Sequence, residues 1–146
     1  MEYTTEVPIN LPRKEVIQLF DSMENMYKWQ PGLLRHNFIE GKPGEEGAIT
    51  ELFYDSKRGE FAMTETITKK ALPDEFHTIY KAKGVYNEMF NYFTEGAGGV
   101  TIWKTVSIFK FKGIMAIMSL FMGSAFKKET LLSMERFKAF CENNTN

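Results

Sequence analysis

Cysteine and histidine are scarce in this sequence. Cys141 is the only cysteine, and the two histidines, His36 and His77, stand far apart. A lone cysteine excludes an internal disulfide, and the sequence has none of the paired His or Cys spacings that hold zinc. We therefore expect no metal and no cofactor. We also expect Cys141 to be a packed helix residue rather than a nucleophile, in a protein suited to the reducing cytoplasm.

A strong charge of one sign is also missing. The 146 residues include 18 basic and 19 acidic side chains, for a net charge of −1. This balance provides no general positive field, so we expect no nucleic acid partner. The N-terminus lacks the pattern of a signal peptide. The longest apolar run, 114–126, is much shorter than the roughly 20 residues of a membrane helix, so we expect a cytoplasmic protein with no integral membrane segment.

Alternating segments make up most of the sequence. Residues 2–9 alternate between apolar and charged positions, which is the period of a half-buried strand. Between 33 and 112, segments rich in β-branched and aromatic residues are separated by short turns containing Gly, Pro or Asp. Such short connections predict an antiparallel meander. Its expected strands are 34–40, 48–55, 60–70, 75–83, 86–94 and 100–111.

Three other segments have helical signals. Pro12 suits the first turn of a helix that runs to about residue 22, and Pro31 with Gly32 ends a second helix over 23–29. The segment 114–142 contains no proline and would form a helix about 43 Å long. Its second half is amphipathic, whereas its first half is apolar nearly all round. The first half therefore needs a cover on both sides.

Four local patterns accompany this order of elements. They are PRKEV at 12–16, WQPG at 29–32, the glycine-rich 41–47 and GGVTIW at 98–103. With these patterns, the whole chain resembles the SRPBCC superfamily, which includes polyketide cyclases, START-like lipid-transfer domains and the major birch pollen allergen. The resemblance implies one α+β domain over 1–146 with the helix-grip fold. In that fold a curved seven-stranded antiparallel sheet, two short helices and one long C-terminal helix enclose a cavity, and the cavity holds the ligand.

The composition favours such a cavity independently. The chain has 13 Phe, 6 Tyr, 2 Trp and 9 Met, more large side chains than a thin single-sheet layer needs. Each of these residues is still more often plain core than a ligand contact. The alternation leaves the phases of 86–94 and 100–111 open, although Lys104 favours the face of 100–111 that puts Trp103 inside. It points Tyr80 inward and His77 outward as a surface residue. The expected ligand contacts are Met63, Glu65, Tyr80, Phe90, Tyr92, Trp103, Met118 and Met122.

Three functions compete at this level. The leading interpretation is a binding or carrier protein for a small hydrophobic molecule, lipid-like or polycyclic. The second is an enzyme resembling a polyketide cyclase, aromatase or dehydratase, with Glu65 and Tyr80 as an acid–base pair. Glu65 shares its strand face with apolar neighbours, where burial disfavours the ionised form. The third, an interaction module resembling a chaperone activator, ranks last.

The apolar segment 114–126 has two alternative covers. Met115, Met118 and Met122 form one stripe, and their flexible thioethers suit a wall that adapts to varied apolar ligands. Ile117 and Phe121 belong to another stripe, which a second copy of the chain could cover. We therefore expect the Met stripe to face the ligand and keep a homodimer as the alternative.

Overall fold

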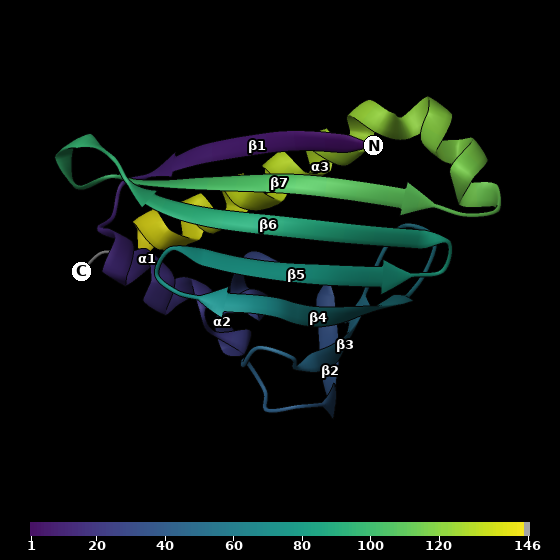
Figure 1. Cartoon of the computed structure of the whole chain (residues 1–146), viewed down its shortest axis with the longest axis horizontal. Helices are drawn as coiled ribbons and strands as arrows, with labels where there is room; N and C mark the ends of the chain where they lie inside the picture. Colours follow the sequence, from purple (N-terminus) through teal and green to yellow (C-terminus); the bar gives the residue numbers. More distant parts are fainter. Residues whose placement is uncertain (145–146) are drawn as a thin grey trace.

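The computed structural model describes residues 1–144 and has the predicted order of elements. Seven antiparallel strands form one sheet in the order β1-β7-β6-β5-β4-β3-β2 (Figure 1). Each predicted strand boundary is within one residue of the observed one. The elements are β1 Glu2–Ile9, α1 Arg13–Phe20, α2 Met23–Trp29, β2 Leu33–Glu40, β3 Ile49–Tyr54, β4 Phe61–Ala71, β5 Glu75–Ala82, β6 Val85–Glu95, a short 3₁₀ turn at Ala97–Gly99, β7 Thr101–Phe111 and α3 Ile114–Asn143.

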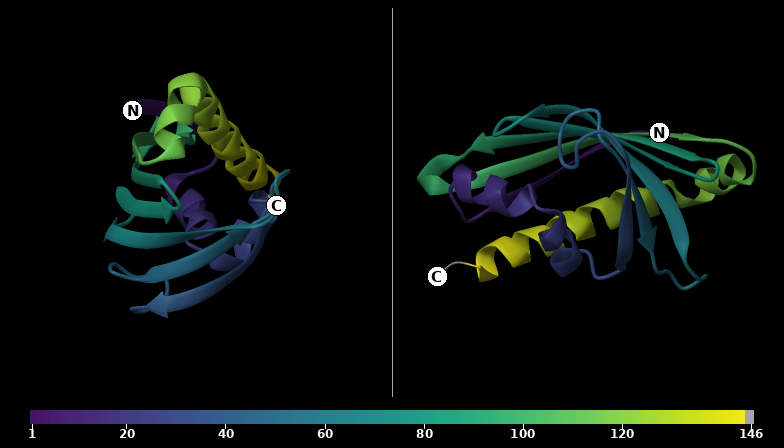
Figure 2. Two further views of the ribbon diagram at one scale, coloured as in Figure 1. Left: turned by 90° about the vertical axis from the view of Figure 1, so that its right-hand side faces the viewer. Right: turned by 90° about the horizontal axis from the view of Figure 1, so that it is seen from below.

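The sheet is strongly curved, and α3 runs along its concave side. Figure 2 shows β2 and β3 curling away from the plane of β6 and β7, with α1 and α2 lying at one end of the sheet. The long helix contacts mainly β1, the edge strand beside β7. The concave surfaces of β3, β4 and β5 therefore lie away from the helix. This architecture confirms the predicted helix-grip fold.

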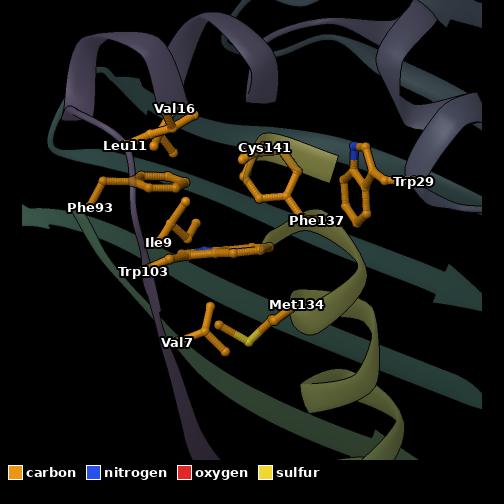
Figure 3. Close-up of a cluster of buried hydrophobic side chains, with 10 residues drawn as sticks. All are labelled: Val7, Ile9, Leu11, Val16, Trp29, Phe93, Trp103, Met134, Phe137 and Cys141. Carbon is orange, nitrogen blue, oxygen red and sulfur yellow. The ribbon is translucent and has the colours of Figure 1, made fainter. Parts of the chain in front are cut away.

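The apolar core lies where the second half of α3 meets β1, β6, β7 and the two short helices. Phe137 is fully buried at its centre, with ring centroids 5.1 Å from Trp29, 5.2 Å from Trp103 and 5.7 Å from Phe20 (Figure 3). Cys141 is buried in the same cluster, and burial raises the pKa of its thiol to about 12. A thiol with so high a pKa is a poor nucleophile and serves here as packing.

The first half of α3 behaves differently from the second. Figure 1 shows the first turns of the helix running in another direction before the helix turns back under β1. Ile114, Ile117, Leu120 and Phe121 are between 62% and 84% exposed. The expectation that this segment is covered on both sides is therefore wrong for the chain by itself. Within residues 1–144, no helix is both long enough and apolar enough to cross a bilayer.

His77 requires a second correction. It lies on the convex face of β5, away from Tyr80, in agreement with the predicted strand phase. Its exposure is only 7%, because the rings of Phe90 and Tyr92 pack against the imidazole at 5.1 Å each. The prediction of a surface histidine fails because large side chains on the neighbouring strand cover it.

We expect Phe137→Ala to lower the free energy of unfolding by about 3–5 kcal/mol, since it leaves a cavity among three aromatic rings. Leu132→Ala, at an exposed position of the same helix, is the matched control and should cost less than about 0.5 kcal/mol. Urea unfolding followed by circular dichroism measures both. Equal losses in the two variants would contradict this description of the core.

Candidate ligand-binding cavity

A cavity of about 1310 Å³ lies between the concave face of the sheet and α3. It exceeds the volume of roughly 300–1,000 Å³ that is usual for a small-molecule site. The cavity exists because α3 packs along β1 and leaves the inner faces of β3, β4 and β5 uncovered. Much of its wall is aromatic or thioether, including Phe20, Met23, Phe76, Met89, Met115 and Phe126.

Four of the predicted ligand contacts line this cavity. Met63 and Glu65 come from β4, Tyr80 from β5 and Trp103 from β7. Trp103 is also part of the core, where its ring stacks on Phe93 at 5.8 Å. It therefore forms the inner end of the wall, and Met63, Glu65 and Tyr80 form the side made by the sheet. Contact of these residues with a ligand stays a prediction.

Phe90 and Tyr92 lie outside the cavity, and their predicted placement in the wall is wrong. The inward residues of β6 are Asn87, Met89 and Asn91. Asn91 can face inward because its side-chain carbonyl accepts hydrogen bonds there. Trp103 Nε1 donates to Asn91 Oδ1 at 2.9 Å, and Thr105 Oγ1 donates to the same oxygen at 2.8 Å. A buried polar group with such partners does not carry the usual desolvation cost.

Met118 and Met122 also lie outside the wall, which corrects the prediction that they contact the ligand. The residues of this segment that reach the cavity are Met115 and Phe126. The ring of Phe126 packs 5.2 Å from both Phe109 and Phe111. Met115 belongs to the predicted Met stripe and Phe126 continues it, so the stripe reaches the cavity only at its two ends, because the helix changes direction between its halves.

Glu65 and Tyr80 form the polar centre of the cavity. The two residues are register partners on β4 and β5, which puts them side by side on the concave face. Tyr80 Oη donates to Glu65 Oε2 at 2.7 Å, and Glu65 is only 8% exposed. No ion pair among residues 1–144 includes Glu65. Burial raises the pKa of its carboxyl, and the hydrogen bond from Tyr80 partly opposes that shift.

Two further polar residues lie beside this pair and were not predicted. Tyr54 of β3 donates its hydroxyl to Gln30 Oε1 at 2.6 Å, and both residues line the cavity. Burial, followed by the charge of Glu65, raises the pKa of Tyr54 and that of Tyr80. Both phenols therefore stay protonated and can donate hydrogen bonds. The alternation of 48–55 could have predicted an inward Tyr54, because Tyr54 shares its strand face with the buried Thr50 and Leu52.

The arrangement is suited to one polar group on an otherwise apolar molecule. A carboxyl and a phenol at hydrogen-bonding distance can accept from a hydroxyl or donate to a carbonyl, and they can also exchange a proton with a bound ligand. Residues 1–144 contain no group of three or more His, Cys, Asp or Glu side chains placed to hold a metal ion.

Comparison with known proteins finds similarity in structure and none in sequence. No protein-family model matches the chain, and no curated protein matches it. A conserved protein from Geobacillus kaustophilus superposes with a TM-score of 0.81 at 12% identity, covering 100% of this chain and 98% of that one. The Zhui aromatase/cyclase from Streptomyces sp. R1128 gives 0.78 at 9%, covering 100% and 96%. A START superfamily protein from Mycobacterium smegmatis gives 0.76 at 11%, covering 99% of each chain.

These neighbours confirm the predicted fold. The coverage is nearly complete in both directions, so the similarity includes the sheet, the short helices and α3 together. At 9–12% identity, the shared feature is the fold alone.

The raised pKa of Glu65 predicts how stability depends on pH. The folded protein holds this proton more tightly than the unfolded chain, so the contribution to stability is present below the ordinary pKa of 4.5 and is lost as the pH rises through the raised value. The loss is about 1.4 kcal/mol for each unit by which the pKa is raised. Glu65→Gln keeps an oxygen for Tyr80 but cannot ionise. It should therefore gain stability relative to the native protein as the pH increases.

Urea unfolding at a series of pH values measures this difference. Glu40→Gln, at an exposed position, removes the same charge and serves as the control, which should show no such gain. Parallel pH profiles for the native protein and Glu65→Gln would contradict a raised carboxyl pKa in the cavity.

Proposed function

We propose that this protein binds or carries a small hydrophobic molecule, lipid-like or polycyclic, in the cavity under α3. The observation that carries the proposal is the combination of a cavity of about 1310 Å³, a largely aromatic and thioether wall and one buried carboxyl–phenol pair. A chain selected only for stability gains nothing from so large an unfilled space, because a void forfeits packing contacts.

The wall explains why the ligand would be apolar. Transfer of apolar surface out of water contributes about 25 cal/mol per Å², so a ligand that buries about 300 Å² would gain roughly 7 kcal/mol before the costs of association. Met63, Met89 and Met115 add side chains that adapt their shape. Such a wall favours several related ligands over a single one.

The Glu65–Tyr80 pair supports a neutral polar group on that ligand. A ligand carboxylate beside Glu65 would add negative charge at a site where burial already disfavours it. A hydroxyl or a carbonyl can instead exchange hydrogen bonds with the pair at little electrostatic cost. The pair would therefore orient the ligand in the cavity, with its apolar body along the wall.

The same pair supports a second candidate function, that of a cyclase, aromatase or dehydratase. One of the structural neighbours is named an aromatase/cyclase. In such a reaction, Glu65 would take a proton from a methylene carbon while Tyr80 donates a hydrogen bond to the carbonyl oxygen under attack. The new carbon–carbon bond forms between that methylene carbon and the carbonyl carbon, whose oxygen takes the proton from Glu65 and becomes a hydroxyl. Dehydration then removes this hydroxyl and a hydrogen of the adjacent carbon as water.

A cavity-filling substitution tests the binding proposal. Ala82 lines the cavity, and Ala82→Trp would place an indole ring in the space that the ligand needs. We expect the affinity for the neutral dye N-phenyl-1-naphthylamine to fall at least tenfold. Lys81→Trp is the matched control, since this neighbouring exposed residue is absent from the wall and should leave the affinity unchanged. A native protein that takes up no apolar probe in titration or native mass spectrometry would refute the proposal.

A separate assay tests the enzymatic candidate. A poly-β-carbonyl thioester is incubated with the protein, and the appearance of aromatic ultraviolet absorbance is followed. If the pair is catalytic, Glu65→Gln and Tyr80→Phe should each lower the rate by about a hundredfold or more, while the affinity for the neutral dye is retained. Rates equal to that of the native protein in both variants would eliminate the pair as an acid–base couple.

A further inference from the structure

The first half of α3 presents an apolar stripe to solvent. Ile114, Ile117, Leu120 and Phe121 recur at helical spacing, and each is at least 62% exposed. Single exposed apolar residues are common on protein surfaces, but a contiguous stripe marks a site of association.

Packing on the opposite side of the helix fixes this orientation. Met115 packs tightly against the β5–β6 turn. A methyl group added at Gly84 would lie only 3.1 Å from the Cγ atom of Met115. Phe126 packs on the rings of Phe109 and Phe111. With this inner side held against the sheet, Leu120 and Phe121 point away from the molecule. The exposed stripe is therefore a fixed surface of the fold.

Lysines gather at the end of the molecule where the stripe begins. Between residues 96 and 128 the chain has no acidic residue, although it carries 19 in total, and the lysines of this stretch are 104, 110, 112, 127 and 128. Of these, Lys104 lies near the other end of β7, opposite Glu6. Lys81 and Lys83 of the β5–β6 hairpin lie at the same end, because Val85 pairs with Phe111 and the Lys112 amide donates to the Gly84 carbonyl. Among residues 1–144, no ion pair includes any of these seven lysines.

On β6, β7 and β1, acidic side chains begin farther from this end of the sheet, whereas Asp55 and Glu60 lie at the same end in the β3–β4 loop, on the far strands. Lys110 is the register partner of Tyr86, and the ammonium groups of Lys110 and Lys81 lie 5.6 Å and 6.0 Å from the centre of its ring. Glu88 and Glu2 both lie opposite Ile108, two positions back along β7. The end of the sheet beside α3 is thus basic in a protein whose net charge is −1.

We propose that this end of the molecule docks on the surface of an anionic lipid bilayer, with the stripe of Ile114, Ile117, Leu120 and Phe121 in the interfacial layer and the lysines against lipid headgroups. An apolar helix face bordered by lysine is the pattern of helices that lie in the plane of a membrane. A second copy of the chain fits less well. A symmetric contact through the stripe would bring two sets of unpaired lysines together.

The docking surface adjoins one end of the cavity. Ala82, Lys83 and Met115 line the cavity and belong to the same hairpin and helix start as the basic end. An apolar ligand could therefore move between the bilayer and the cavity without crossing water. This last step rests on the proposed ligand-binding function, whereas membrane docking does not.

Vesicle flotation of the full chain tests the docking. We expect the protein to float with vesicles of phosphatidylcholine mixed with phosphatidylglycerol, to release as salt is raised, and to stay behind with phosphatidylcholine alone. Lys110→Gln with Lys112→Gln should lower the partition coefficient by about 25-fold, since each lysine near an anionic surface contributes about a factor of five. Leu120→Ser with Phe121→Ser should lower it at least tenfold.

Two double variants are matched controls and should bind vesicles like the native chain. Lys14→Gln with Lys42→Gln removes two exposed charges from the opposite end of the molecule, and Leu131→Ser with Leu132→Ser removes two exposed apolar residues from the second half of α3. Circular dichroism checks that every variant is folded. Because the substituted side chains are exposed, the fold should be unchanged.

Three results would overturn the docking proposal. They are absence of flotation with the mixed vesicles, equal binding by native protein and both test variants, and a stable dimer in sedimentation equilibrium that Phe121→Ser dissociates while vesicle binding is absent.

Ala82→Trp separates the two proposals. If it abolishes dye binding but leaves flotation intact, the membrane surface is independent of the cavity, and if the native protein floats but takes up no probe, only the ligand-binding proposal fails.

Discussion

The seam between α3 and β1 is the constraint on which the rest of the structure depends. The helix is joined to this edge strand at several points along its length. Tyr3 Oη shares a hydrogen bond of 2.6 Å with Thr130 Oγ1, Thr5 Oγ1 donates to the sulfur of Met134 at 3.1 Å, and the Asn10 amide donates to Glu142 at 2.9 Å. Because these contacts hold α3 at one side, the curved sheet extends beyond the helix and leaves the space that the cavity occupies.

This space gives a buried carboxyl an unusual setting. In a filled core, a glutamate without an ionic partner would be strongly destabilising. Glu65 instead faces a cavity that a ligand can occupy, and its register partner Tyr80 supplies one hydrogen bond. The raised pKa of this carboxyl would favour neutral polar groups on a ligand bound as proposed. One strand pairing thus determines both the position of the pair and its chemistry.

The two halves of α3 have different structural roles. The second half supplies Met134 and Phe137 to the core and holds the sheet in shape. The first half contributes Met115 and Phe126 to the cavity and leaves the rest of its apolar surface outside. A helix that changes direction can close a cavity on one side and present an interaction surface on the other. Exposure of this stripe to water costs free energy, and docking on a membrane would offset that cost.

The sequence by itself determined the order and bounds of the elements, because strand periodicity and turn residues are local signals. It also assigned Glu65 and Tyr80 each to one face of a strand, whereas the structure showed that these two faces line the cavity. Only the tertiary structure decided which face of β6 is inside, since both faces mix polar and aromatic residues and Asn91 finds its partners, Trp103 among them, on another strand. The direction of 114–126 was likewise decided by packing against the sheet, which helical periodicity does not encode.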